Sequence, residues 1–187
     1  MTISEIREYL LDDLKVSVED DVKPCLNIGS SRGGYFAVPR LFCSYIDFLG
    51  RLYRAGHEVF LRDICGTSDP NYRIYGKLLW EVYRNGLIHT YQPKTLQHSG
   101  HKISWVIHKG GRVHALSNGR QLVHIVPQRT DSSNWIQPIS VNCLYQDLLS
   151  AIDQFAEVIA QDRQLESNFV HVANELLEPG ETNIKWW

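Results

Sequence analysis

Residues 84–91 read Arg84-Asn85-Gly86-Leu87-Ile88-His89-Thr90-Tyr91 and close the clearest helical pattern in the middle of the chain. Each residue of an α-helix turns about 100°, so Asn85 and His89 lie on one face, with Glu81 one turn earlier. Arg84 and Tyr91 nearly share a second face. Together these side chains could bind a phosphate group. The competing interpretation is an ordinary helix end, where cationic side chains interact favourably with the helix dipole.

The spacing of Arg84 and His89 resembles the Arg-x-x-x-x-His motif of the HEPN superfamily, in which a polar residue such as Asn85 follows the arginine. Tyr91 extends the likeness to the form of the motif found in HEPN toxins that pair with a nucleotidyltransferase antitoxin. The resemblance implies a helical ribonuclease that acts as a symmetric homodimer, with Arg84, Asn85 and His89 as catalytic residues. It also implies that Tyr91 accepts AMP from the antitoxin.

The composition describes an ordinary globular protein. The chain has 187 residues, 43% hydrophobic and 21% charged, so we expect one domain over residues 1–187. The net charge of -2 excludes a broad basic field, and RNA binding would need a local basic patch. No apolar run approaches the roughly 20 residues of a membrane span, and no signal peptide is evident. Four widely spaced cysteines predict reduced thiols in the cytoplasm.

Apolar residues at helical spacing predict helices over residues 3–16, 39–55, 70–91 and 140–178. Local signals mark where these helices begin. Thr2 and Glu5 form a capping-box pair, and Pro39 suits a first helical turn. Thr67-Ser68-Asp69-Pro70 is a strong start for the third helix, and Ser140 caps the last one.

The periodicity changes to two after residue 93. Alternating residues over 103–108, 112–116 and 121–126 predict a three-stranded antiparallel β-meander within about residues 100–127. Asn118-Gly119 is its clearest hairpin signal. No cysteine or acidic cluster accompanies the histidines of this region, so we expect no metal site and no cofactor. Those histidines are His98, His101, His108, His114 and His124.

This order of elements predicts a mainly α fold. Its simplest packing is a four-helix up-and-down bundle with the small meander inserted before the last helix. Such a bundle is also what the HEPN resemblance implies, with the motif at the end of the third helix. The meander is a departure from the minimal HEPN toxins.

The second predicted helix carries a polar stripe opposite its apolar face. Asp47 belongs to this stripe, and the HEPN resemblance gives it, like Glu81, a supporting role in the cleft. Three arginines of the helix could supply the local basic patch for RNA: Arg40, Arg51 and Arg54. The alternative is a solvated face on which Asp47 pairs with Arg51 one turn away.

Three functional hypotheses follow. The first is a metal-independent HEPN-type endoribonuclease, with or without an antitoxin, that cleaves RNA by 2′-OH attack in a dimer cleft. Histidine suits the proton transfers and arginine suits the phosphate oxygens. The second is a catalytically silent module that binds a nucleotide or a protein through the same residues. The third is a helical protein without phosphate chemistry, in which Arg84 is salt-bridged and His89 is buried.

Overall fold

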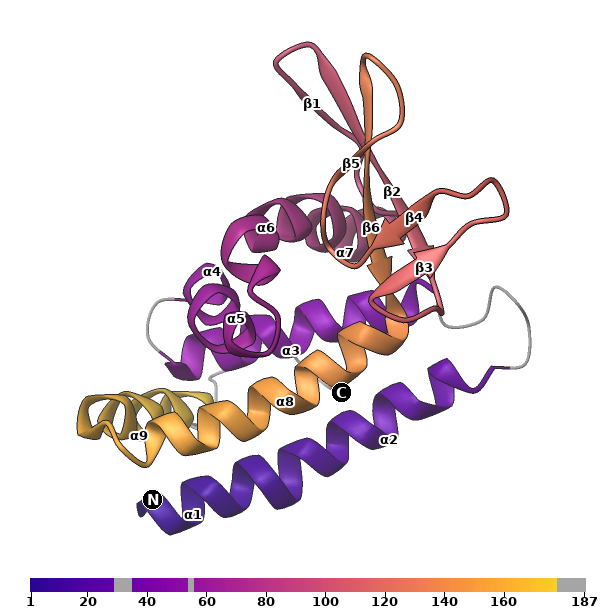
Figure 1. The fold of residues 1–187 in the computed structure, drawn as a ribbon. Helices are drawn as coiled ribbons and strands as arrows, with labels where there is room; N and C mark the ends of the chain where they lie inside the picture. The colour runs from indigo at the N-terminus through magenta and orange to yellow at the C-terminus, as the bar shows by residue number, and fades with distance from the viewer. Residues whose placement is uncertain (29–34, 54–55, 178–187) are drawn as a thin grey trace, which may run out of the picture.

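A computed structural model describes residues 1–28, 35–53 and 56–177, and for residues 88–90 it describes the backbone alone. A layer of helices forms one end of the molecule, and a narrow sheet rises from it (Figure 1). Among the described helices, none is both long enough and apolar enough to cross a bilayer.

A long N-terminal helix lies along the bottom of the helical layer (Figure 1). It begins with the predicted capping box, in which Thr2 and Glu5 each cap the other's backbone N–H. The predicted end near residue 16 is wrong, because Val18 and Val22 continue the buried stripe for two more turns. Its parts follow one another without a break: α1 (Ile3–Glu8), η1 (Tyr9–Leu14) and α2 (Lys15–Leu26).

Helix α3 (Ala37–Tyr53) runs through the middle of the helical layer and contacts α2, α8 and α9. Phe42, Ile46 and Leu49 are buried, which confirms the apolar face expected of an interior helix. Residues 57–68, which lie between two predicted helices, are also helical. They consist of α4 (His57–Phe60), η2 (Leu61–Cys65) and α5 (Gly66–Ser68).

The helix that carries residues 84–91 begins where the sequence predicted. The Asp69 carboxylate accepts a hydrogen bond from the Asn71 N–H at 2.9 Å, which caps the first turn. The Tyr83 hydroxyl reaches the carbonyl oxygens of Val106 at 3.2 Å and Gln137 at 2.5 Å, and this contact anchors the helix to the sheet. The successive parts are α6 (Asn71–Leu79), η3 (Trp80–Arg84) and α7 (Asn85–Thr90).

The predicted three-stranded meander is wrong. Residues 101–108 do form a strand, but it pairs in parallel with residues 134–140, and Ile103 lies opposite Trp135. A mixed sheet with the order β1-β2-β6-β5 results, and the Asn118-Gly119 turn closes a separate hairpin of β3 with β4. The strands are β1 (Leu96–His98), β2 (His101–His108), β3 (Val113–Ala115), β4 (Gln121–Val123), β5 (Gln128–Arg129) and β6 (Asn134–Ser140).

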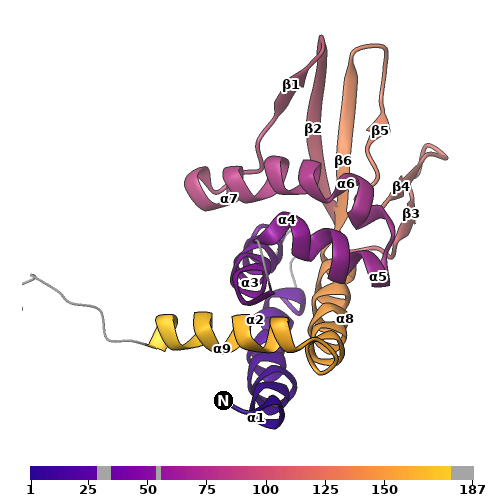
Figure 2. The same ribbon diagram turned by 90° about the vertical axis from the view of Figure 1, so that its left-hand side faces the viewer.

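Helix α8 (Val141–Ile159) continues directly from β6, and the Ser140 hydroxyl accepts from the Cys143 N–H at 3.2 Å, as the predicted cap requires. The single helix expected to residue 178 is interrupted. The Asp162 carboxylate accepts from the N–H groups of Gln164 and Leu165 and starts a new helix, α9 (Arg163–Leu177). Figure 2 shows α9 crossing the end of α8.

The fold is therefore mixed α/β, and the expected four-helix up-and-down bundle is wrong. Helices do form in the four predicted regions, but the last is interrupted, residues 57–68 are also helical, and a four-stranded mixed sheet accompanies them. The parallel β2–β6 pair fixes the start of α8 beside the helix that carries the motif, so the sheet is part of the framework rather than an insertion.

Candidate active site

Arg84 and Asp47 form an ion pair between the end of η3 and the middle of α3. The Arg84 Nη2 lies 3.3 Å from the Asp47 Oδ2. The Arg84 side chain is 29% exposed, and its buried Nε has no hydrogen-bond partner among the described residues. The guanidinium is thus only partly satisfied within the protein, and it retains donor capacity for an anion.

His57 joins this pair, although the sequence analysis did not single it out. Its Nδ1 lies 3.7 Å from the Asp47 Oδ1, and its ring stacks on Trp80 with ring centres 3.8 Å apart. Burial lowers the pKa of His57, and this effect outweighs the opposing influence of the Asp47 carboxylate. The imidazole is therefore mainly neutral at pH 7 and can accept a proton.

Two glycines explain how His57 reaches Asp47. Gly56 has a φ of 92°, and its N–H donates to the Gly50 carbonyl at 3.0 Å. A Cβ on Gly50 would lie 2.6 Å from the backbone of both Gly56 and His57. The chain can fold back against α3 only because residue 50 has no side chain. His57 lies between two of the predicted helices, and the sequence carries no local signal for this contact.

The predicted neighbours Glu81 and Asn85 are in contact. The Asn85 Nδ2 donates to the Glu81 Oε2 at 3.2 Å across one helical turn. The Asn85 amide therefore already has an acceptor within its own helix.

Arg40 and Tyr91 form a second contact between the same two helices. The Arg40 guanidinium lies 4.6 Å from the centre of the Tyr91 ring, and Tyr91 is 67% exposed. Tyr91 ends α7 with a φ of 60°, after which the chain turns back against Gly86. The Asp47–Arg84 and Arg40–Tyr91 contacts both join α3 to the continuous η3–α7 helix, and they lie seven residues, or about 10 Å, apart on each. The surface along this junction of two helices, which is hollowed at its Tyr91 end, is called the groove below.

Of the remaining predicted site residues, only Arg51 has a described side chain. Arg51 is exposed on α3, and the solvated-face alternative of an Asp47–Arg51 pair gives way to the Asp47–Arg84 pair. Arg54 lies outside the described residues, and the His89 side chain is likewise outside the described part of α7.

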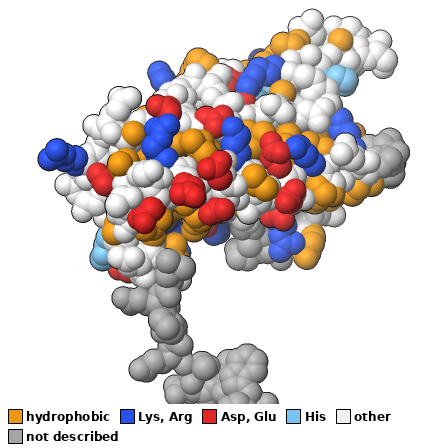
Figure 3. All heavy atoms as spheres, turned by 90° about the horizontal axis from the view of Figure 1, so that it is seen from below, with side chains coloured by type: hydrophobic (Ala, Val, Ile, Leu, Met, Phe, Trp, Pro, Cys, Tyr) orange, Lys and Arg blue, Asp and Glu red, His pale blue; other side chains and the backbone are white. Residues whose placement is uncertain are grey.

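The charge of the opposite side of the molecule offers no alternative RNA surface. Figure 3 shows the molecule from below, where acidic and basic side chains are interspersed. Two pairs illustrate this mixing: Arg7 with Glu157 at 2.8 Å, and Lys15 with Asp153 at 2.6 Å. Acids beside cations in this way give the described part of this face a mixed charge rather than a single-sign patch for phosphate.

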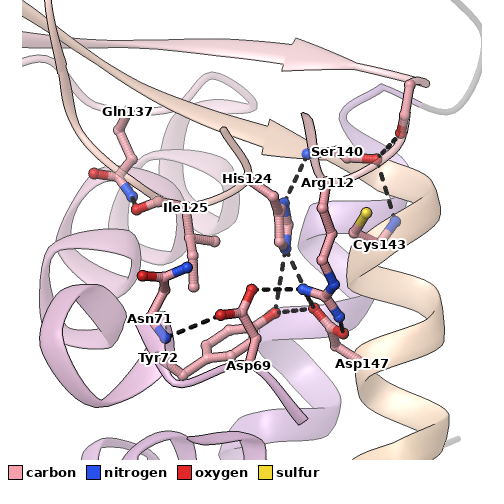
Figure 4. A network of polar contacts seen from close by, with 11 residues as sticks. Asp69, Asn71, Tyr72, Arg112, His124, Ile125, Gln137, Ser140, Cys143 and Asp147 are labelled. Atoms are coloured by element: carbon pink, nitrogen blue, oxygen red, sulfur yellow. Dashed lines mark hydrogen bonds and ion pairs between the residues drawn. The ribbon is translucent and has the colours of Figure 1, made fainter. Parts of the chain in front are cut away.

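A second polar cluster surrounds Asp147 of α8 (Figure 4). Its carboxylate accepts from the Tyr72 hydroxyl at 2.9 Å and from Arg112, which also pairs with Asp69 at 2.5 Å. The His124 Nε2 lies 3.3 Å from the same carboxylate. Burial raises the pKa of Asp147, but hydrogen bonds from His124 and Arg112 outweigh it, so its pKa lies below the ordinary value.

This second cluster is structural. The Ser140 N–H donates to the His124 Nδ1 at 3.0 Å, so the proton of the neutral ring is on Nε2 and points to Asp147. Both ring nitrogens are thus engaged, and His124 and Asp147 are each 1% exposed. The imidazole and the carboxylate are thus shielded from solvent. The cluster instead ties the β3–β4 hairpin region to α6 and α8.

Among the described residues, no three His, Cys, Asp or Glu side chains gather in the way that metal ligands do. The four cysteines are free thiols. No protein-family model, curated protein or solved structure matches this chain.

Proposed function

We propose that the groove between α3 and α7 is the active site of an endoribonuclease of HEPN type. The observation that carries this proposal is the Arg84 guanidinium, partly exposed and incompletely satisfied, beside the neutral imidazole of His57. A cation for phosphate oxygens and a base for a hydroxyl are the two groups that RNA cleavage by its own 2′-OH requires.

In the proposed reaction His57 takes the proton of the 2′-OH, and the 2′-oxygen attacks phosphorus. Arg84 stabilises the charge that develops on the phosphorane oxygens. The bond from phosphorus to the 5′-oxygen breaks, and that oxygen needs a proton from a second group. His89, or an imidazole of a second copy, fills this role in the proposal, so we expect a homodimer with a two-fold axis near the groove. The products are a 2′,3′-cyclic phosphate and a 5′-hydroxyl.

One observation favours a second candidate, a catalytically silent module that binds RNA or a nucleotide. Arg84 and Asn85 both have intramolecular carboxylate partners, Asp47 and Glu81. Such partners would hold the two side chains in place for binding without requiring turnover. The third hypothesis, a structural role alone, also includes a salt-bridged Arg84. Substitutions separate the three.

The test is an RNA cleavage assay with and without a chelator, on a 5′-labelled single-stranded RNA. We expect Arg84→Ala, His57→Phe and His89→Ala each to lower the rate by roughly 100-fold or more, the usual contribution of a general acid or base or of a group that stabilises transition-state charge. His57→Phe keeps a ring to stack on Trp80, so it removes proton transfer with little loss of packing.

Arg163→Ala and His171→Ala are matched controls, because both residues are exposed on α9, away from the groove. Cleavage should be unchanged in them and should persist in the chelator. If the wild type binds RNA without cutting it and Arg84→Ala abolishes binding, the silent module is correct. If Arg84→Ala changes neither binding nor cleavage, Arg84 has only a structural role.

The proposal extends to cellular context. An enzyme of this kind would act on RNA in the cytoplasm, an environment that suits four free thiols. A nucleotidyltransferase antitoxin is the proposed regulatory partner, and Tyr91 is its proposed target.

A further inference from the structure

A hollow of about 380 Å³ opens at the Tyr91 end of the groove between α3 and α7. Its volume lies at the lower end of the roughly 300–1,000 Å³ typical of small-molecule sites. The wall is almost wholly apolar, with one cation at its edge. The lining residues are Phe36, Ala37, Arg40, Leu41, Leu87 and Tyr91.

Two aromatic rings of this hollow are exposed, and each contacts a residue of another element. Phe36 is 39% exposed and packs edge-on against Trp105 of β2, with ring centres 5.7 Å apart. Tyr91 is 67% exposed and lies against the Arg40 guanidinium. An exposed ring with one packed side offers a flat surface on which a planar ligand can stack.

The position of Tyr91 depends on Gly86. A Cβ on Gly86 would lie 2.2 Å from the Gln92 carbonyl oxygen and 2.5 Å from the Lys94 backbone nitrogen. The Lys94 N–H donates to the Val82 carbonyl, so the chain folds back tightly after α7. This reversal places the Tyr91 ring at the end of the groove.

The hollow and the Asp47–Arg84 pair lie about 10 Å apart along the same two helices, which is seven residues at about 1.5 Å each. Three stacked nucleotides span a similar distance, at roughly 3.4 Å each. A phosphate at Arg84 and a base in the hollow can therefore belong to one short strand.

We propose that the hollow is a nucleobase-binding subsite for single-stranded RNA, a step that rests on the proposed function. A base would stack on the Tyr91 or Phe36 ring, and Arg40 would interact with the adjoining phosphate. Every base has a π-face, so stacking tolerates any sequence, whereas the cation selects for a charged backbone. An apolar peptide would pack against the apolar lining of the hollow, but it would offer no anion to Arg40.

The experiment measures binding of a fluorescent 2′-O-methyl hexanucleotide, which cannot be cut because its 2′-oxygen is blocked. Tyr91→Leu and Phe36→Leu keep apolar bulk and remove the ring, and each should weaken binding about 10- to 100-fold by loss of stacking. Tyr91→Phe keeps the ring and should bind like the wild type. Thermal unfolding of each variant checks that the fold is retained.

An abasic hexamer with the same phosphates provides the second arm. It should bind the wild type about 10- to 100-fold more weakly than the hexanucleotide, and the two leucine variants should weaken it no further. Equal affinity of both leucine variants and the wild type for the base-containing strand would overturn the subsite. So would tight binding of the abasic strand.

These outcomes are distinguishable from failure of the proposed function. If RNA is cut and Arg84→Ala abolishes cleavage, but the affinity is the same with and without bases, the proposed function stands and the subsite is wrong. If the wild type never cuts RNA but binding depends on the two rings, the subsite stands and the nuclease assignment is wrong.

Discussion

The Arg84 Nη2 lies 3.3 Å from the Asp47 Oδ2, and this ion pair joins two helices across 37 positions of sequence. The pair lies at the surface, with 42% of the Asp47 side chain exposed. Asp47 also lies beside His57, so a single carboxylate influences both the cation and the imidazole of the candidate site.

Removal of the Asp47 charge should strengthen RNA binding. Asp47→Asn keeps an oxygen beside Arg84 but removes the competing anion, so we expect affinity to rise a few-fold at low salt and to converge with the wild type at high salt. Stability should change by no more than about 1 kcal/mol, as for other exposed ion pairs. Fluorescence anisotropy at two salt concentrations measures the first effect and denaturant unfolding the second. Weaker RNA binding by Asp47→Asn would contradict the proposed role of Arg84.

The Gly50 position tests whether His57 must stay beside Asp47. Gly50→Ala places a Cβ 2.6 Å from backbone atoms, so it should cost roughly 1–3 kcal/mol of stability and displace His57, with a loss of cleavage. Gly111→Ala is the matched control, because a Cβ there meets no atom within 4 Å. Urea unfolding and the cleavage assay are run on both variants. Full activity in a folded Gly50→Ala protein would show that His57 is dispensable.

The Asp147 cluster should matter for stability more than for activity. Asp147→Asn removes the buried carboxylate that Arg112, His124 and Tyr72 share, while Arg112 keeps Asp69, so it should destabilise the fold by about 1–3 kcal/mol. Asp153→Asn, on the same helix, breaks only the exposed pair with Lys15 and should cost less than about 1 kcal/mol. Denaturant midpoints measure both. Equal effects from the two substitutions would refute a structural role for the cluster.

Protonation of His108 should destabilise the folded protein in acid. Burial, followed by the neighbouring His114 and His124, lowers the pKa of His108 to about 4, and its Nε2 has no hydrogen-bond partner. The unfolded state therefore binds this proton more readily. The contribution of neutral His108 to the free energy of unfolding is complete above about pH 6.5. It is lost as the pH falls towards 4, by up to about 3 kcal/mol.

His108→Asn tests this origin, because the amide oxygen can still accept from the Gly110 N–H as Nδ1 does now. Unfolding measured from pH 7 to pH 4 should show a smaller decline in the variant than in the wild type. An unchanged decline would place the acid sensitivity elsewhere.

Tyr91 is predicted to accept AMP from a nucleotidyltransferase partner. Its side chain is accessible, and an adenylyl group would place an anion near Arg40 in the groove, where it would block RNA by charge and bulk. Co-expression with a nucleotidyltransferase encoded nearby, followed by mass measurement, should reveal the added group on the wild type and not on Tyr91→Phe. The alternative is that Tyr91 only ends the helix, and then no mass is added.

The sequence alone determined the features that depend on neighbours along the chain. The Thr2–Glu5 capping box, the Ser140 cap, the start of α6 at Asp69 and the Asn118-Gly119 hairpin were all predicted correctly. Each rests on contacts within a few residues, which local propensity and side-chain hydrogen bonding specify. The contact between Glu81 and Asn85 follows from helical spacing in the same way.

Only the tertiary structure decided the rest, because it depends on which distant segments meet. Hairpin signals in residues 103–126 predict pairing between strands that are adjacent in sequence. Strand β2 instead pairs in parallel with β6, and a parallel pair needs a long connection that leaves no local signal. Pro138 also concealed β6, since proline is unusual inside a strand. His57 reaches Asp47 through a turn that Gly50 permits, and Tyr72 meets Asp147 across 75 positions. Periodicity shows which face of an element is buried, but the packing of the whole chain determines what lies against it.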